Sequence, residues 1–367
     1  AGVGVTYSLT SNPGGRFTID SATGQIRVAS ANSIDFETNS SFTLGVRATD
    51  SANNVSDTSL TVVVTDVNEA PTLTSAASVN FAEGGAGVAY TITSSDPDAD
   101  KSVSYSLSGA DAALFDINTT NGQVTFKNLP DFETKADQGA DGVYAITVTA
   151  TDAGGLTASK SVTITVTNVN EAPTFTSGAT AALAENATGV VYTATGTDVD
   201  GDSLTFFLGG ADAGLFTIDG QTGQLTFKAP PNFEAPQDIG GNNVYDVTVF
   251  ASDGALVASK ALQVTVTGVN EAPLNATWSS GGSVAENSAA NTVVGTVTAQ
   301  DPDADDTRSY TLVNTADGRF TIDGGTGEVR VATGASLNFE GNDKHTIRVR
   351  TTDGSGLSTE TDLTVNV

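Results

Sequence analysis

The stretch TNVNEAPTF, Thr167–Phe175, contains the tetrapeptide Asn-Glu-Ala-Pro, which the chain uses three times. The copies lie at Asn68–Pro71, Asn170–Pro173 and Asn270–Pro273, so successive copies are 102 and 100 residues apart. A motif that recurs at a nearly constant period of this length indicates small domains in series. The 367 residues of the chain are enough for about four such domains.

Other short motifs recur at the same spacing and in the same order. FTID at Phe17–Asp20 is followed by DFE at Asp35–Glu37 and ATD at Ala48–Asp50. Their later counterparts are FDIN or FTID at Phe115–Asn118, Phe216–Asp219 and Phe320–Asp323, and DFE or NFE at Asp131–Glu133, Asn232–Glu234 and Asn338–Glu340. The pattern predicts repeats 1 to 4 with the boundaries 1–71, 72–173, 174–273 and 274–367. Repeat 1 is about 30 residues short at its N-terminal end.

Within each repeat the apolar residues alternate with polar ones. YAITVTATD (Tyr144–Asp152) and SVTITVT (Ser161–Thr167) place apolar side chains at every second position, as half-buried strands do. Turn signals such as TTNG and DAGG separate these runs at spacings of about ten residues. No amphipathic helix is evident. We expect an all-β fold: a tandem array of Greek-key sandwiches with about seven strands each.

The charge balance excludes several classes of function. Asp and Glu number 43 against 15 Lys and Arg, so the formal charge of -28 disfavours nucleic acid and anionic membranes as partners and favours cations. No apolar run approaches the roughly 20 residues of a membrane-spanning helix. The chain has no cysteine and one histidine, which argues against zinc and other soft or borderline metals. Motifs for nucleophilic catalysis are missing as well, and we expect no enzyme.

Acidic residues occur at fixed places in the repeats. Each of the later repeats has an Asp-x-Asp pair in its first long loop: Asp96 and Asp98, Asp198 and Asp200, and Asp301 and Asp303. Carboxylates two residues apart in an irregular loop can face one centre, and calcium takes six to eight oxygen ligands. This pattern favours calcium.

The ordered set of motifs resembles the cadherin repeat. Ala-Glu-Asn at Ala184–Asn186 resembles the family's motif near the first strand, DFE its Asp-Arg-Glu, ATD its Ala-x-Asp, and DVNEAP (Asp66–Pro71) its interdomain linker. The resemblance covers essentially the whole chain. The Ala- and Gly-rich composition, without cysteine or methionine, is similar to that of cadherin-like arrays in bacterial surface and secreted adhesins. The resemblance implies an extracellular location for this chain.

The resemblance also implies that calcium ions lie where one repeat meets the next. We call the junctions at Pro71, Pro173 and Pro273 junctions 1, 2 and 3, and expect at least two calcium ions at each. For junction 1 the resemblance implies Asp35, Glu37, Asn68, Glu69, Asp96, Asp98 and Asp152. For junction 2 it implies Glu83, Asp131, Glu133, Asn170, Glu171, Asp198, Asp200 and Asp253. For junction 3 it implies Glu185, Asn232, Glu234, Asn270, Glu271, Asp301, Asp303 and Asp353.

Departures from the family pattern concern individual ligands. The family linker reads Asp-x-Asn-Asp-Asn-x-Pro, so Asn-Glu-Ala-Pro lacks one ligating Asn. Asn232 stands where junction 2 has Asp131, and we expect junction 3 to bind calcium more weakly for that reason. Repeat 1 contains no counterpart of Glu83.

The repeats fall into two subtypes in the order A-B-B-A. From the Glu of DFE to the Asp of ATD is 19 residues in repeats 2 and 3 but 13 in repeats 1 and 4, and the difference lies in the loops ADQGAD (Ala136–Asp141) and DIGGNN (Asp238–Asn243). We expect His345 to be exposed or at a strand edge. Trp278 and the Phe of each FTID motif are expected to pack in the core or at a junction.

The favoured function is a calcium-stiffened adhesive spacer of an extracellular bacterial protein. Two alternatives stay open: a subunit of a self-assembling filament or sheath, and a calcium-dependent glycan-binding module, for which the sequence shows no exposed aromatic platform. Expected partners are further cadherin-like repeats or neighbouring chains that complete repeat 1, and a cell-surface glycan or protein.

Overall fold

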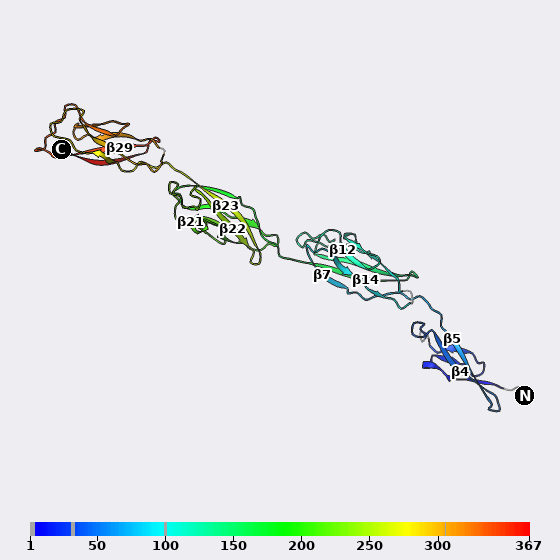
Figure 1. Ribbon diagram of the computed structural model, residues 1–367. Helices are drawn as coiled ribbons and strands as arrows, with labels where there is room; N and C mark the ends of the chain where they lie inside the picture. Colours follow the sequence, from blue (N-terminus) through cyan, green and yellow to red (C-terminus); the bar gives the residue numbers. More distant parts are fainter. Residues whose placement is uncertain (1–3, 31–33, 99–100, 305) are drawn as a thin grey trace. The chain divides into compact units, whose positions relative to one another are not determined.

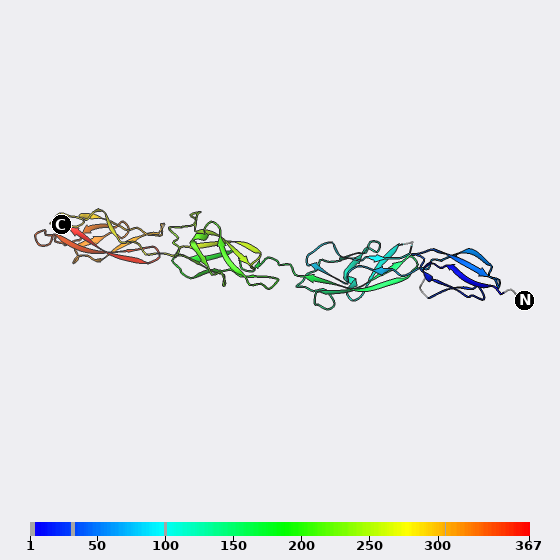
Figure 2. The same ribbon diagram turned by 90° about the horizontal axis from the view of Figure 1, so that it is seen from below.

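The computed structural model describes residues 4–30, 34–98, 101–304 and 306–367. The predicted start of repeat 1 lies outside this part. The chain divides into two compact units, Ala1–Val169 and Asn170–Val367. Among the described residues the regular structure is β, apart from the short 3₁₀ turns η1 (Pro13–Gly15), η2 (Ala112–Leu114) and η3 (Ala213–Leu215). The strands of each repeat form a sandwich of their own (Figure 1, Figure 2).

Repeat 2 shows the complete arrangement. One sheet has the strand order β10-β13-β14-β7, the other has β11-β12-β8, and β6 pairs with β9. All pairs are antiparallel except β14 with β7. The strands are β6 (Thr72–Leu73), β7 (Ser78–Ala82), β8 (Val88–Thr91), β9 (Ser94–Ser95), β10 (Val103–Ser108), β11 (Phe115–Ile117), β12 (Gln123–Phe126), β13 (Val143–Asp152) and β14 (Thr157–Thr167).

Alternation along β13 and β14 builds the core between the two sheets. Tyr144, Ile146 and Val148 point inward from β13, Val162 and Ile164 lie beside them on the same face of the sheet, and all are buried. Phe115, the first residue of FDIN, packs edge-on against Tyr144. The four Phe residues of these motifs are all buried, which confirms that they pack in the cores.

Repeat 3 repeats this topology in the second unit. Its sheets have the orders β16-β23-β22-β19 and β17-β21-β20, with β15 paired to β18. The strands are β15 (Thr174–Phe175), β16 (Thr180–Ala184), β17 (Val190–Thr193), β18 (Gly196–Thr197), β19 (Thr205–Gly209), β20 (Phe216–Ile218), β21 (Gln224–Phe227), β22 (Val244–Ser252) and β23 (Val257–Thr267).

Repeat 4 pairs its first strand over a longer stretch than repeats 2 and 3, in which β6 pairs with β9 and β15 with β18 over two residues each. Here β24 pairs with β25 in the order β24-β25-β28-β27, and β26-β29-β30 forms the second sheet. Gly281 and Gly282 follow with positive φ, and a Cβ at Gly281 would lie 2.3 Å from the carbonyl oxygen of Val294. The strands are β24 (Thr277–Gly281), β25 (Val293–Thr298), β26 (Ser309–Asn314), β27 (Phe320–Ile322), β28 (Glu328–Val331), β29 (Lys344–Thr352) and β30 (Ser358–Asn366).

Repeat 1 has a smaller set of strands and a smaller core. Its sheets are β1-β4-β5 and β2-β3. Leu60 on β5 is 44% exposed, whereas Val162, at the same position of repeat 2, is 1% exposed, because β7 lies beside β14 but no described strand lies beside that edge of β5. The strands are β1 (Thr6–Ser11), β2 (Phe17–Ile19), β3 (Ile26–Val28), β4 (Ser41–Thr49) and β5 (Val55–Val63).

The longer loops of repeats 2 and 3 are fixed by buried carboxylates. Asp111 accepts hydrogen bonds from the backbone N–H groups of Gln138 and Ala145, both at 2.7 Å. Asp212 does the same for Ile239 and Asp246 in repeat 3. Each carboxylate therefore anchors a loop to the strand that follows it, which gives the extra residues a structural role.

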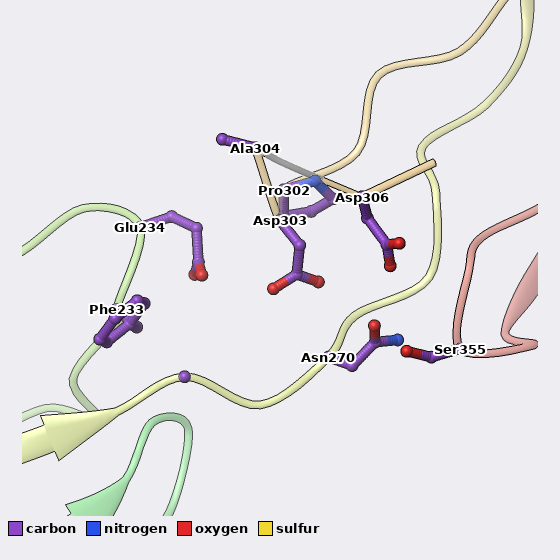
Figure 3. A pocket seen from close by; sticks show the side chains of 9 residues that line it. Phe233, Glu234, Asn270, Pro302, Asp303, Ala304, Asp306 and Ser355 are labelled. Carbon is purple, nitrogen blue, oxygen red and sulfur yellow. The ribbon is translucent and has the colours of Figure 1, made fainter. Parts of the chain in front are cut away.

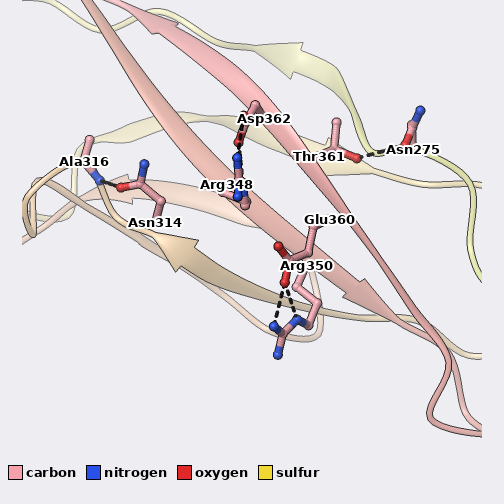
Figure 4. Close-up of polar contacts among 8 residues, drawn as sticks. All are labelled: Asn275, Asn314, Ala316, Arg348, Arg350, Glu360, Thr361 and Asp362. Atoms are coloured by element: carbon pink, nitrogen blue, oxygen red, sulfur yellow. Dashed lines mark hydrogen bonds and ion pairs between the residues drawn. The ribbon is translucent and has the colours of Figure 1, made fainter.

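Repeats 1 and 4 share a surface feature that the middle repeats lack. Arg350 binds Glu360 across β29 and β30, and Arg348 binds Asp362 beside it (Figure 4). Arg47 and Asp57 form the equivalent pair in repeat 1. These exposed pairs each contribute little, about 0.2–1 kcal/mol. They distinguish the two subtypes structurally.

The prediction that His345 is exposed or at a strand edge is wrong, since the side chain is buried and β29 is the central strand of its sheet. His345 is only 8% exposed and points inward from β29, at the core position that Tyr144 and Tyr245 occupy in repeats 2 and 3. The strand register explains this, because His345 pairs with Val365 as Tyr144 pairs with Ile164. The alignment of KHTIRV with VYAITV is the sequence signal that predicts a core residue here. Trp278 packs against the same core, as expected.

Candidate metal centres

Junction 1 lies within the first unit, and its linker is attached to the loops of repeat 2. Asn68 Nδ2 donates a hydrogen bond to Asp152 Oδ2 (2.9 Å), and the Glu69 N–H donates to Asp98 Oδ2 (3.0 Å). A Cβ at Gly154 would lie 2.3 Å from Asn68 Oδ1, so the linker side chain lies close against this glycine. These contacts bring Asn68 and Glu69 to the acidic loops of the next repeat.

Three carboxylates are buried together at this junction. Asp96, Asp98 and Asp152 are 6%, 7% and 8% exposed, and each offers an oxygen within 4.8 Å of the other two. Asp96 Oδ2 and Asp98 Oδ1 are buried without any hydrogen-bond partner in the structure. Burying charged oxygens without partners costs much free energy, so the arrangement calls for a cation. The donors are all hard oxygens, which fits calcium.

A second group of carboxylates lies at the rim of the same junction. Glu37, Asp66, Glu69 and Asp98 each offer an oxygen within 4.8 Å of the others. Partial desolvation, and then the charges of Glu37 and Asp98, raise the pKa of Glu69. The ligand set predicted for junction 1 does not include Asp66. Its signal was the acid at the start of DVNEAP, where the other linkers have Asn168 and Gly268.

Junction 3 lies within the second unit and has a cluster of glutamates. Glu185, Glu234 and Glu271 offer oxygens within 4.8 Å of one another. Glu185 is 2% exposed, and it accepts hydrogen bonds from the N–H groups of Val269 (2.8 Å) and Phe233 (2.9 Å). Burial, and then the negative charge of Glu185, raises the pKa of Glu271. Like charges are thus held together here.

The loops of repeat 4 complete the residues at junction 3. Asn270 Nδ2 donates to Asp353 Oδ2 (2.8 Å), and the Glu271 N–H donates to Asp303 Oδ2 (2.8 Å). Glu271 Oε2 and Asp301 Oδ2 are buried without a hydrogen-bond partner. Glu234, Asp303, Asp306 and Asn270 line a cleft of about 720 Å³ (Figure 3).

Asp306 is a further residue that motif reading missed at junction 3. Its Oδ1 accepts a hydrogen bond from the Gly354 N–H at 3.1 Å, and it lines the cleft with Asp303. The signal in the sequence was the extra acid of DPDADD, where the matching loop of repeat 2 reads DPDADK. Asn186 also joins the site, because its Nδ2 donates to Glu271 Oε1 (3.1 Å).

The residues predicted for junction 2 belong to both units. In the first unit, Glu83 accepts hydrogen bonds from the N–H groups of Val169 and Phe132, both at 2.7 Å, as Glu185 does in the second. Glu133 follows Phe132 in the DFE motif. The second unit holds the linker residues and the acidic loops: Asn170 Nδ2 donates to Asp253 Oδ2 (2.8 Å), the Glu171 N–H to Asp200 Oδ2 (2.9 Å), and the Asp200 N–H to Asp198 Oδ1 (3.0 Å).

The first residue of each DFE or NFE motif has a local role. Asp35 Oδ1 accepts a hydrogen bond from the Thr38 N–H, and this bond is the main cause that lowers the pKa of Asp35. Asp131 Oδ1 and Asn232 Oδ1 accept in the same way from Thr134 and Ala235. One oxygen of each side chain is therefore used within its own turn.

Comparison with known proteins identifies the fold independently. The family model for the cadherin domain matches residues 2–65, 77–167 and 281–367. Among solved structures, protocadherin gamma B7 extracellular cadherin domains 1–4 resemble the chain with a TM-score of 0.62 at 20% identity, over 100% of this chain and 92% of that one. Mouse cadherin-23 EC22–24 gives 0.57 at 21% identity, over 82% of this chain and 99% of that one.

Relatives in sequence belong to the same class. Human protocadherin Fat 4 is 28% identical over 377 residues, which is 96% of this chain and 7% of the relative. Human cadherin-18 is 30% identical over 364 residues, which is 89% of this chain and 45% of the relative. The chain thus spans less than half the length of either protein. No described helix is long and apolar enough to cross a membrane.

Cadherin domains bind calcium and serve in adhesion at the cell surface. The matched ranges leave out the whole of repeat 3, but its strands pair in the same order as those of repeat 2. The chain therefore belongs to the cadherin domain family.

Proposed function

We propose that the chain is a spacer of an extracellular adhesive protein, that it consists of four cadherin repeats with the boundaries given above, and that calcium at the three junctions stiffens it. The starts of β6 at Thr72 and β15 at Thr174 support these boundaries. The role is structural rather than catalytic, because the acids recur at every junction instead of forming one unique pair.

One observation carries the proposal. At junction 1, Asp96 Oδ2 and Asp98 Oδ1 are buried beside Asp152 without hydrogen-bond partners. Calcium bound there would supply the positive charge that these oxygens lack. Asp98 belongs to both carboxylate groups of the junction, so it would couple the buried group to the rim.

The chain's own residues explain why binding would restrict the linker. Asn68 and Glu69 are attached to the loops of repeat 2 through Asp152 and Asp98, and repeat 1 contributes Glu37 to the rim. Without a cation, the crowded charges oppose this arrangement, as the raised pKa of Glu69 indicates. A calcium ion that binds only the assembled junction shifts the equilibrium toward that state. The stiffness of the chain should therefore increase with the calcium concentration.

The finer assignment is a bacterial surface or secreted adhesin. The composition supports this assignment, because the chain has 39 glycines and contains neither cysteine nor methionine. The named relatives are animal proteins, with which identity is 30% or less.

Small-angle scattering of the full chain with calcium and with a chelator tests the proposal. We expect a smaller and more variable maximum dimension after chelation, together with a lower melting temperature, because the carboxylates repel one another across each linker. An unchanged maximum dimension and an unchanged melting temperature would refute the calcium-stiffened spacer.

A glycan-binding role has one supporting observation. Phe207 on β19 and Phe250 on β22 stack with their ring centroids 4.9 Å apart and an interplanar angle of 9°, and Phe207 is 42% exposed. The sequence does not predict this partly exposed pair of rings. Binding on a glycan array that is lost in Phe207→Ser, the residue type at the matching position Ser106, would promote this role.

The filament alternative concerns the open edge of β5. Leu60 lies uncovered there, and a neighbouring chain or a further repeat could place a strand along that edge as β7 does beside β14. Concentration-dependent polymers in sedimentation experiments would favour the neighbouring chain.

A further inference from the structure

The only histidine of the chain is buried in the core of repeat 4. His345 pairs with Val365, as Phe42, Tyr144 and Tyr245 pair with residues of the matching strands in the other repeats. All four side chains are therefore at one equivalent core position. Repeat 4 alone places a group there that titrates near neutral pH.

The surroundings of His345 suit the neutral ring. Asn342 Nδ2 lies 3.2 Å from His345 Nδ1, and an amide nitrogen can only donate, so Nδ1 is the acceptor and the ring proton is on Nε2. Nε2 is buried and has no hydrogen-bond partner in the structure. The ring of Phe320 lies edge-on against the imidazole with centroids 6.0 Å apart. A protonated ring would have two donors and a charge without an acceptor for either.

The charged groups near His345 add to this effect. Arg319, next to Phe320 on β27, carries a positive charge that is partly balanced by Asp317, to which it donates a hydrogen bond of 2.9 Å. From β30 the facing residue is the apolar Val365, and on its own strand Lys344 is exposed. Burial first, and then Arg319, lower the pKa of His345, while Asp317 raises it less.

A second buried polar group weakens the same core. Thr351 points inward from β29 where repeats 1, 2 and 3 have Ala48, Ala150 and Ala251, and its Oγ1 is buried without a partner. A buried hydroxyl without a partner destabilises the core that contains it. The core of repeat 4 thus holds two unsatisfied polar atoms, His345 Nε2 and Thr351 Oγ1.

We propose that His345 makes repeat 4 an acid-sensitive element: protonation of the buried ring loosens the sandwich of repeat 4, while repeats 2 and 3, which have tyrosine at this position, keep theirs. The direction in which the stability of repeat 4 changes with pH follows from proton linkage. Because the folded-state pKa lies below the unfolded value of about 6.5, the unfolded state binds more protons, and stability is lost as the pH falls below about 6.5.

The full chain contains its own reporter for repeat 4. Trp278 is the only tryptophan; it packs against this core, and its Nε1 donates a hydrogen bond to the Thr364 carbonyl oxygen at 3.1 Å. Urea unfolding followed by tryptophan fluorescence therefore measures repeat 4 within the intact chain. The wild type is compared with His345→Tyr and His345→Phe, which introduce the residues of the other repeats, at pH 7.5 and pH 5.0 with the same calcium concentration.

We expect the unfolding constant of repeat 4 in the wild type to rise more than in both variants as the pH falls, by up to about tenfold per pH unit below 6.5. Carboxylates titrate alike in all three proteins and cancel in this comparison. Parallel pH dependences in the wild type and a folded variant would overturn the proposal. If both variants fail to fold, the single imidazole resonance of the wild type decides by NMR. A folded-state pKa below 6.5 supports the proposal, and one at or above 6.5 overturns it.

Discussion

Junctions 1 and 3 carry out the same connection with different sets of acids. Junction 1 buries three aspartates, Asp96, Asp98 and Asp152, and has Asp66 at its rim. At junction 3 the cluster consists of the glutamates Glu185, Glu234 and Glu271, and Glu185 accepts hydrogen bonds from two backbone N–H groups. Each junction lacks one acid that the pattern predicts and has another nearby: Asp66 where repeat 1 has no counterpart of Glu83, and Asp306 where Asn232 replaces an aspartate.

The two junctions have the same number of carboxylates among the described residues. There, junction 1 has seven: Asp35, Glu37, Asp66, Glu69, Asp96, Asp98 and Asp152. Junction 3 also has seven in the described part of the chain: Glu185, Glu234, Glu271, Asp301, Asp303, Asp306 and Asp353. The comparison suggests that the number of carboxylates around a junction is kept while their positions in the motif vary. Three divalent ions would bring either set from -7 to -1.

The largest effect is expected from Glu185→Ala at junction 3. The change removes the acceptor for the Val269 and Phe233 N–H groups, and hydrogen bonds to a charged group contribute about 1.5–3 kcal/mol each. We expect the unfolding free energy of the second unit to fall by about 3 kcal/mol without calcium, measured by urea unfolding. Asp219→Asn, which removes an acid from an exposed turn of repeat 3, is the control. Equal effects of the two changes would show that Glu185 has no special role.

Asp98→Asn should separate the two junctions. Asp98 belongs to both carboxylate groups of junction 1, so calcium affinity there should fall by about tenfold or more, while junction 3 keeps its affinity. The amide signals of Gly154 and Gly354, which lie beside Asn68 and Asp306, report on the two junctions in an NMR titration. Asp303→Asn is the matched variant and should reverse the pattern. A loss at both junctions from either single change would contradict independent sites.

Asp66→Asn and Asp306→Asn test whether the total charge matters. Each removes one carboxylate that lies outside the predicted ligand set, and we expect each to weaken its own junction by a few-fold, about half of the Asp98→Asn effect on the free-energy scale. The same glycine signals provide the measurement. If neither variant changes its junction, the equal number of acids has no bearing on binding.

Asn232→Asp should give the smallest change. The new carboxylate adds charge at junction 3, but one of its oxygens will still cap the turn at Ala235, so affinity should rise by about two- to fivefold. Asp131→Asn is the reciprocal change at junction 2. An unchanged or lower affinity in Asn232→Asp would show that Asp306 already compensates fully.

Much of the fold could be predicted because the same alternation of apolar and polar residues recurs in each repeat. Alternation in Tyr144–Asp152 and the fixed turns specify strands, and the buried Phe of each FTID motif marks the core. The length of the pairing between β24 and β25 could not be predicted, since it depends on how closely Gly281 and Gly295 approach each other in space. The polarity of His345 predicts an exposed side chain, but its register opposite Val365 places the side chain in the core.

The candidate site was predictable where residues follow the linker. Asn68 and Glu69 belong to the recurring linker motif, and the structure shows them hydrogen-bonded to Asp152 and Asp98. Asp66 and Asp306 were missed, since they become neighbours of the site only through the folding of the linker and of a loop with one extra acid. The double use of Asp35 and Asp131 as turn caps likewise depends on backbone geometry.

The most direct measurement is the number of calcium ions that the full chain binds at equilibrium, by calorimetric titration with flow dialysis as the check. The account predicts at least six ions per chain, two at each of three junctions, with dissociation constants of about 10⁻⁴–10⁻³ M, as extracellular calcium modules typically have. Binding of fewer than six ions would contradict two per junction, and no binding up to 10 mM calcium would contradict the account as a whole.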